Sequence, residues 1–158
     1  MVKKSYWKLA ASILLCQLAG VIGSFFTSSS VSTWYLTLKK PFFNPPNWLF
    51  GPVWVSLYLL MGVSLYLVWN REIRSAQSKK ALYLFGVQLI LNVLWSALFF
   101  GLRSPLSALI GIVVLWIVIL FTIKYFYNVS KAAAYLLIPY ILWVSFAMAL
   151  NFSISWLN

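Results

Sequence analysis

Residues 106–127 read LSALIGIVVLWIVILFTIKYFY, and this stretch decides the fold. It runs for 18 residues before its first charged side chain, Lys124. A helix that crosses the hydrocarbon core of a bilayer needs roughly 20 mostly apolar residues. The stretch therefore predicts a transmembrane helix.

Four other stretches have the same character, at about residues 8–27, 51–69, 81–101 and 133–157. Ser, Pro, Asn and basic residues separate them. No stretch alternates strongly between apolar and polar residues, which argues against a β-barrel. The sequence predicts an all-α integral membrane bundle of five transmembrane helices, and five spans in 158 residues make a single domain of residues 1–158.

The composition agrees and limits the chemistry. Apolar residues make up 63% of the chain and charged residues 8%, against about 25% in an ordinary soluble domain. There is no His, one cysteine (Cys16) and one acidic residue (Glu72). These counts exclude a zinc or iron site, a Ser-His-Asp triad, a carboxylate pair, a disulfide framework and an intramembrane proton relay.

The basic residues predict an orientation. One side of the five-span topology would carry nine of them: Lys3, Lys4, Lys8, Arg71, Arg74, Lys79, Lys80, Lys124 and Lys131. The other would carry three: Lys39, Lys40 and Arg103. The positive-inside rule then puts the N-terminus in the cytoplasm and the C-terminus outside. Topology and anionic lipids account for the net charge of +11, so no nucleic-acid partner is expected.

A cleaved signal peptide is the competing interpretation of residues 1–27. The apolar run is too long for an ordinary signal sequence, and no small-x-small cleavage site follows it. A lipoprotein site at Cys16 would need a small residue before it, where the chain has Leu15. We expect the first span to be retained.

Helical spacing places polar side chains on one face of the third span. Gln88, Asn92 and Ser96 recur every four residues, flanked by Trp95 and Phe99. Carboxamides that faced lipid would be costly, so this stripe should point into the bundle.

Two other spans carry matching faces. Phe50, Trp54 and Tyr58 form an every-fourth-residue stripe in the second span, and Trp143 and Ala147 share a face of the fifth with Leu150 and Asn151. Pro139 removes a helix hydrogen bond near Tyr135 and should kink the fifth span.

Most tryptophans fit an interfacial belt, because they lie near span ends: Trp7, Trp34, Trp48, Trp69 and Trp156. Trp116 lies mid-span without polar companions, and we expect it to face lipid. Trp95 and Trp143 lie on faces that also carry asparagine. For the amides alone, helix–helix contacts and a ligand pocket remain equal alternatives.

The predicted orientation gathers the three stripes at one level, between the midplane and the outer face. Above them lies the first loop, which Pro41, Pro45 and Pro46 stiffen. A rigid loop over aromatic rings and a few amides suits a flat, largely apolar ligand. Lys39 and Lys40 could meet carboxylates at its wet edge, although snorkelling lysines would look the same.

Three blocks of sequence resemble a known family. Residues 40–54 read KPFFNPPNWLFGPVW, residues 88–101 read QLILNVLWSALFFG, and residues 136–151 read LLIPYILWVSFAMALN. In order and spacing they are similar to the tryptophan-rich sensory protein/translocator protein family (TspO/MBR, the peripheral-type benzodiazepine receptor family). The resemblance covers roughly residues 7–157.

The resemblance implies a five-helix bundle, commonly a homodimer, that binds protoporphyrin IX, haem and synthetic lipophilic ligands. In bacterial members of the family, pocket tryptophans are implicated in light-dependent porphyrin breakdown, and Trp54 and Trp143 match that pair. The positions that match the family's ligand-binding residues are Tyr35, Pro45, Phe50, Trp54, Tyr58, Asn92, Trp95, Ser96, Trp143 and Ala147. Residues 150–158, LNFSISWLN, lack the Tyr and basic residue of the sterol motif of animal members, so sterol binding there is not expected.

Four functions follow as hypotheses: a tetrapyrrole sensor, a carrier of porphyrins or other lipophiles, a porphyrin-degrading photo-oxidase, and a packing-only assembly partner. Ordinary acid–base catalysis lacks its residues, since Glu72 is in the inner loop. No cofactor or metal is expected. Without histidine, haem should bind by stacking and shape. Small-residue pairs permit close helix contacts without locating a dimer interface: Ala19 with Gly23, Ala97 with Gly101, and Ser107 with Gly111.

Overall fold

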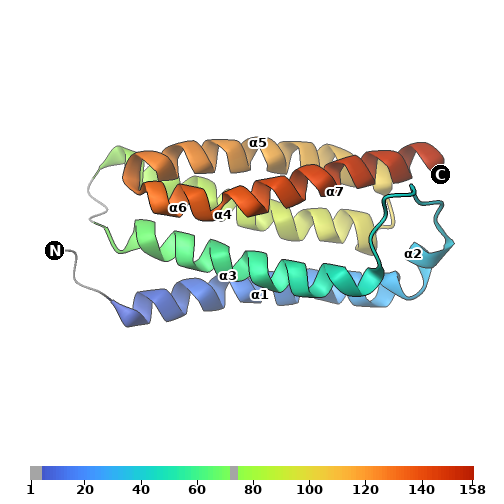
Figure 1. Cartoon of the computed structure of the whole chain (residues 1–158), viewed down its shortest axis with the longest axis horizontal. Helices are drawn as coiled ribbons and strands as arrows, with labels where there is room; N and C mark the ends of the chain where they lie inside the picture. Colours follow the sequence, from blue (N-terminus) through green and yellow to red (C-terminus); the bar gives the residue numbers. More distant parts are fainter. Residues whose placement is uncertain (1–4, 72–74) are drawn as a thin grey trace.

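Figure 1 shows long helices lying side by side, with the start of the first helix and the end of the last at opposite ends of the bundle. This computed structural model describes residues 5–71 and 75–158. Five helical segments are long and apolar enough to cross a membrane: Tyr6–Val31, Asn47–Trp69, Ala76–Gly101, Pro105–Val129 and Lys131–Leu157. The predicted five-helix membrane bundle is confirmed, with each span a few residues longer than the apolar run that predicted it.

The segments contain these elements in chain order: α1 (Tyr6–Val31), α2 (Trp34–Thr37), the 3₁₀ turn η1 (Asn47–Leu49), α3 (Phe50–Trp69), α4 (Ala76–Ser96), the π-helical turn η2 (Ala97–Gly101), α5 (Pro105–Val129), α6 (Lys131–Leu136) and α7 (Ile138–Leu157). Serine caps start three of them. The hydroxyls of Ser75, Ser104 and Ser130 each accept a hydrogen bond from the backbone N–H three residues later. Such a bond satisfies one of the free donors at a helix start.

The fifth span bends where the sequence predicts it. α6 ends at Leu136, α7 begins at Ile138, and Pro139 lies in the first turn of α7. On the side of the break away from the first loop, α3 packs closely on α6, whereas its contacts with α7 are sparse. The bend therefore leaves α3 and α7 apart in the half of the bundle that faces the first loop.

Basic side chains gather at the end where α1 begins. Lys8 Nζ donates to the backbone oxygen of Trp69 at 3.3 Å, and Lys80 Nζ lies 4.9 Å from the centre of the Tyr125 ring. These contacts bring three of the predicted basic segments to the same end. Three basic residues used in the orientation argument, Lys3, Lys4 and Arg74, lie outside the described residues, as does Glu72, the acidic residue assigned to the inner loop.

Small residues allow the helices to approach closely. A Cβ added at Gly62 of α3 would lie 2.7 Å from the Cα of Ile13 in α1. Gly23 of α1 faces Ser96 at ordinary van der Waals distance, and Gly101 faces the ring of Phe26. Two glycines of the predicted small-residue pairs, Gly23 and Gly101, thus pack against other helices of the same chain.

Trp116 corrects an expectation. It is half-buried, packs against the core, and its indole N–H donates to Ser145 Oγ at 2.8 Å. The prediction that it faces lipid without a polar companion is wrong, because its partner lies on α7 and no spacing within α5 shows that partner. Trp34, which we assigned to the interfacial belt, packs against Phe99 with ring centres 5.7 Å apart.

Candidate ligand-binding cavity

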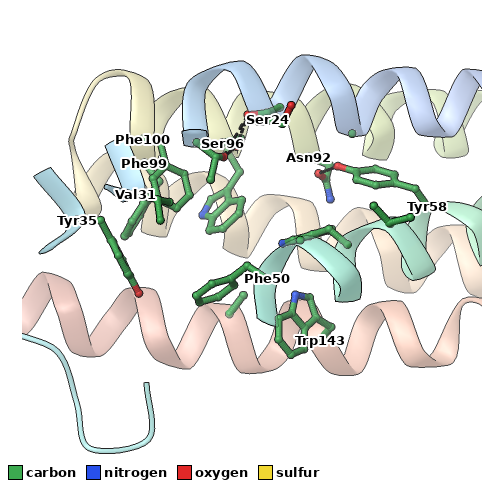
Figure 2. Close-up of a pocket in the computed structure, with 18 of the residues that line it drawn as sticks. Ser24, Val31, Tyr35, Phe50, Tyr58, Asn92, Ser96, Phe99, Phe100 and Trp143 are labelled. Atoms are coloured by element: carbon green, nitrogen blue, oxygen red, sulfur yellow. Dashed lines mark hydrogen bonds between the residues drawn. The ribbon is translucent and has the colours of Figure 1, made fainter. Parts of the chain in front are cut away.

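A cavity of about 270 Å³ lies in the half of the bundle next to the first loop. α1, α2, α3, α4, η2 and α7 all contribute side chains to it. Its aromatic lining consists of Tyr35, Phe50, Trp54, Tyr58, Trp95, Phe99, Phe100 and Trp143. Figure 2 shows several of these side chains extending from different helices toward a common space. The predicted convergence of rings from three spans is therefore present.

The structure brings together nine of the ten candidate site residues. Those that line the cavity are Tyr35, Phe50, Trp54, Tyr58, Asn92, Trp95, Ser96, Trp143 and Ala147. Pro45 does not line it, although it belongs to the loop above. The interior-facing stripe of α4 is also as predicted, because Gln88, Asn92 and Ser96 are all buried.

The rings form two facing groups. On α3 and α4, the ring centre of Trp54 lies 5.6 Å from that of Tyr58 and 6.3 Å from that of Trp95. Near α7, Phe50 lies 6.3 Å from Trp143. These separations lie in the range at which aromatic pairs attract each other. All five rings line the cavity and offer faces and edges to a flat ligand.

The polar atoms at the deep end are tied to each other across three helices. Tyr58 Oη donates to Asn92 Oδ1 at 2.6 Å, Asn92 Nδ2 donates to Tyr140 Oη at 2.9 Å, and Tyr140 Oη donates to Gln88 Oε1 at 2.8 Å. Tyr58 and Asn92 line the cavity, whereas Tyr140 and Gln88 lie behind them. We left open whether the amides serve helix–helix contacts or a ligand pocket. Asn92 does both, since it joins helices and also borders the cavity.

A second amide holds a wall of the cavity. Trp95 Nε1 donates to Asn151 Oδ1 at 3.1 Å, and Asn151 Nδ2 donates to the backbone oxygen of Pro105 at 2.8 Å. Both Trp95 and Asn151 line the cavity. Because its N–H is engaged, Trp95 offers the cavity its ring rather than a hydrogen-bond donor.

α1 contributes one wall that the sequence argument missed. Its lining residues are Gln17, Gly20, Val21, Gly23, Ser24, Thr27 and Val31. Gly20 lies against the Tyr58 ring, where an added Cβ would be 2.7 Å from two ring carbons. Ser96 Oγ donates to the backbone oxygen of Gly23 at 3.2 Å. Gly23 was a signal in the sequence, but we paired it with Ala19 only as evidence of close helix packing.

The first loop forms a fixed roof. Tyr35 is buried beneath it, and Tyr35 Oη donates to Asn44 Oδ1 at 2.6 Å. Burial raises the pKa of Tyr35 to about 12, so this hydroxyl keeps its proton at neutral pH. Lys40 Nζ lies 4.9 Å from the centre of the Tyr35 ring. The loop also meets the end of α7, where Asn158 Nδ2 donates to the backbone oxygen of Lys39 at 3.0 Å.

The cavity reaches the outer surface of the bundle between α1 and α3. Val21 and Val55 both line it and are 50% and 58% exposed. Gln17 Nε2 donates to the backbone oxygen of Val55 at 3.1 Å and joins the two helices at this edge. The cavity is thus bordered at this edge by apolar side chains on the exterior of the bundle.

Comparison with known proteins matches this geometry to a family. Residues 12–157 match the TspO/MBR family. The chain belongs to the TspO/MBR family. It is 52% identical over 151 residues to a tryptophan-rich protein TspO of Archaeoglobus fulgidus, covering 96% of this chain and 97% of the relative.

Other TspO/MBR relatives extend the match. A tryptophan-rich protein TspO of Chlorobaculum tepidum is 48% identical over 155 residues, covering 98% of each chain. The translocator protein of Homo sapiens is 38% identical over 135 residues, covering 84% of this chain and 79% of the relative. This member of the TspO/MBR family is thus a multi-pass integral membrane protein with an aromatic cluster beneath its first loop.

Proposed function

We propose that the protein is a membrane receptor or sensor that binds flat, lipophilic ligands, tetrapyrroles such as protoporphyrin IX and haem among them, in the cavity beneath the first loop. The observation that carries this proposal is the ring-lined cavity between α3, α4 and α7. Among the described residues its lining contains no charged side chain, so stacking and apolar burial dominate what it can offer.

The size of the cavity suggests how a large ligand would sit. About 270 Å³ is slightly below the roughly 300–1,000 Å³ that is usual for sites of drug-sized ligands. A molecule of two or three fused rings would fit inside. A tetrapyrrole would place part of its macrocycle between the rings and extend through the opening beside Val21 and Val55 into the bilayer.

We place the roof end of the cavity on the extracytoplasmic side. Basic residues gather at the opposite end of the bundle, where Lys8 and Lys80 make their aromatic contacts. The positive-inside rule assigns that end to the cytoplasm. Lys40, which lies over Tyr35, is then positioned to meet a ligand carboxylate at the outer edge of the cavity.

Light-dependent oxidation of a bound porphyrin is the second candidate. Trp54 and Trp143 both line the cavity, and Trp54 lies in a group of oxidisable rings with Tyr58 and Trp95. An excited porphyrin held against these rings would be close enough to take an electron from a tryptophan, and dioxygen would have to serve as the oxidant that accepts the electrons lost in net oxidation of the macrocycle. Receptor and photo-oxidase make different predictions once light is applied.

One titration separates the candidates: quenching of tryptophan fluorescence by protoporphyrin IX, first in the dark and then under light. The variants are Trp54→Phe and Trp143→Phe, with Trp156→Phe as control because Trp156 is 82% exposed at the end of α7. Receptor binding predicts saturable dark quenching that both pocket variants weaken and the control does not. Light-dependent loss of the porphyrin band that requires both pocket tryptophans would assign the photo-oxidase. Absence of saturable quenching in the wild type would refute binding.

A further inference from the structure

A buried row of hydrogen bonds leads away from the floor of the cavity. It joins Tyr58, Asn92, Tyr140 and Gln88 through contacts of 2.6, 2.9 and 2.8 Å. All four side chains are at most 5% exposed, and only the first two line the cavity. Figure 2 shows the Tyr58 ring directed at Asn92 beside the other lining residues.

The row has a direction. Each donor, from Tyr58 to Asn92 to Tyr140, points its hydrogen away from the cavity. Tyr58 Oη therefore has only lone pairs left for a ligand, and the floor is a hydrogen-bond acceptor. We call this arrangement the inward direction.

Nothing in the geometry restricts the row to that direction. The oxygen and nitrogen ends of a carboxamide have almost the same shape, so turning Gln88 and Asn92 over preserves all three contacts. Gln88 Nε2 would then donate to Tyr140, Tyr140 to Asn92 and Asn92 to Tyr58, which frees the Tyr58 hydrogen for the cavity. We call this the outward direction, in which the floor is a hydrogen-bond donor.

The two directions differ in which atom of the buried Gln88 side chain has a hydrogen-bond partner. In the inward direction Gln88 Nε2 is buried without a hydrogen-bond partner among the described residues. In the outward direction Gln88 Nε2 donates to Tyr140 Oη, and Gln88 Oε1 no longer accepts a hydrogen bond from it. Each direction has three bonds within the row. The inward direction leaves both N–H groups of Gln88 unpaired, whereas the outward direction pairs one of them and leaves the Tyr58 hydrogen unpaired instead. Because the numbers of bonds and of unpaired donors are the same, neither direction is strongly preferred until a ligand contributes a fourth bond at Tyr58.

We propose that Gln88 is a specificity-determining residue that never touches the ligand: through Tyr140 and Asn92 it sets whether Tyr58 accepts a hydrogen bond from a ligand or donates one. The floor of the cavity thus accommodates flat ligands of either polarity by reversing a buried row of hydrogen bonds. This inference rests on the proposed binding of flat lipophiles in the cavity and specifies its polar selectivity.

Gln88→Leu should break the balance in a known direction. With leucine at 88, the inward direction leaves the Tyr140 hydroxyl as a buried donor without an acceptor. In the outward direction Tyr140 donates to Asn92 and Asn92 to Tyr58, so the donor left unpaired is the Tyr58 hydroxyl, which faces the cavity, where a ligand can accept its hydrogen. Since an unmet buried donor costs free energy, the variant should favour ligands that accept a hydrogen bond.

Three tricyclic probes of nearly equal shape test this. Carbazole presents an N–H donor, 9-fluorenone presents a carbonyl acceptor at the equivalent position, and fluorene presents neither. Calorimetry in one detergent gives the dissociation constants of carbazole and 9-fluorenone, and their ratio is compared between variants. Partition of the probes into micelles is the same for every variant, so it cancels in this comparison. We expect Gln88→Leu to weaken carbazole relative to 9-fluorenone by about fivefold, the worth of roughly one hydrogen bond. Fluorene should change little.

The controls distinguish a relay from a general loss of packing. In a Tyr58→Phe background, Gln88→Leu should leave the ratio unchanged, because the row no longer ends in a hydroxyl. Ser64→Ala removes another buried donor, which bonds the backbone oxygen of Ala133, and should lower stability without altering the ratio. Gln88→Met keeps the side-chain length and should shift the ratio as Gln88→Leu does, which provides the test if the leucine variant fails to fold.

The outcomes separate this inference from the function on which it rests. Saturable binding of the probes with an unchanged ratio in both Gln88 variants would overturn the relay and leave the receptor standing. The same shift in the Tyr58→Phe background would also overturn it, because the effect would not pass through Tyr58. Failure of the wild type to bind any probe would overturn both proposals.

Discussion

Replacing Gly20 by alanine tests how tightly the floor of the cavity is built. The new Cβ would lie 2.7 Å from two carbons of the Tyr58 ring, whereas unstrained carbon contacts are about 3.5–4.0 Å. The ring must therefore move by roughly 1 Å. The Tyr58–Asn92 hydrogen bond is 2.6 Å long, so a shift of that size along the bond would take it to the limit of hydrogen bonding or beyond.

The magnitude follows from two opposing effects. Losing a buried hydrogen bond costs about 1–3 kcal/mol, and replacing glycine by alanine inside a helix returns up to about 1 kcal/mol. We expect Gly20→Ala to lower the free energy of unfolding by about 1 kcal/mol. It should also weaken binding of a flat ligand, because the displaced ring narrows the cavity.

Gly23→Ala is the matched control. Gly23 lies one turn further along α1 and lines the same cavity, but its added Cβ would meet Ser96 at an ordinary 3.7 Å. This variant should be as stable as the wild type or slightly more stable. Thermal unfolding in detergent and protoporphyrin titration check both variants. Equal stability and equal affinity of Gly20→Ala and Gly23→Ala would refute the tight contact between α1 and Tyr58.

Three further predictions concern other parts of the molecule. Gly62→Ala should destabilise the bundle by about 1 kcal/mol or more, because its Cβ would meet the backbone of Ile13 at 2.7 Å. Gly86→Ala has open space and should be neutral or stabilising. Thermal unfolding compares the two variants, which share the gain of about 1 kcal/mol that alanine has over glycine inside a helix. Burial raises the pKa of Tyr35 to about 12, so this group should not affect stability below pH 10. From pH 10 toward 12 the free energy of unfolding should fall, because the tyrosine ionises first in the unfolded chain. In denaturant titrations at a series of pH values, Tyr35→Phe should show a smaller fall over this range. Haem should bind about as tightly as protoporphyrin IX, since the chain has no histidine, and an absorption spectrum with strong nitrogen ligation would contradict this.

The fold could be predicted from the sequence because bilayer crossing depends on local composition. An apolar run of sufficient length needs no knowledge of its neighbours, and a proline such as Pro139 bends a helix wherever that helix lies. The stripe of Gln88 and Asn92 was also predictable, because exposing carboxamides to lipid is costly in any arrangement.

The parts that sequence reasoning missed depend on which helices are neighbours. Trp116 shows no polar companion on its own helix, yet Ser145 of α7 accepts its N–H. Gly20 belongs to the cavity only because α1 packs beside α3 and brings it against Tyr58. Pro45 is in the roof loop without lining the space below, since proline spacing indicates a stiff loop without fixing which residues face inward.

The central claim is that rings from α3, α4 and α7 enclose a space that holds a flat ligand. Crystals grown with a bromine-substituted carbazole test it most directly, through the anomalous signal of the bromine. We predict a single strong peak in contact with the rings of Trp54, Trp95 or Trp143. A peak found only on the lipid-facing surface, with those rings closed against each other, would contradict the claim.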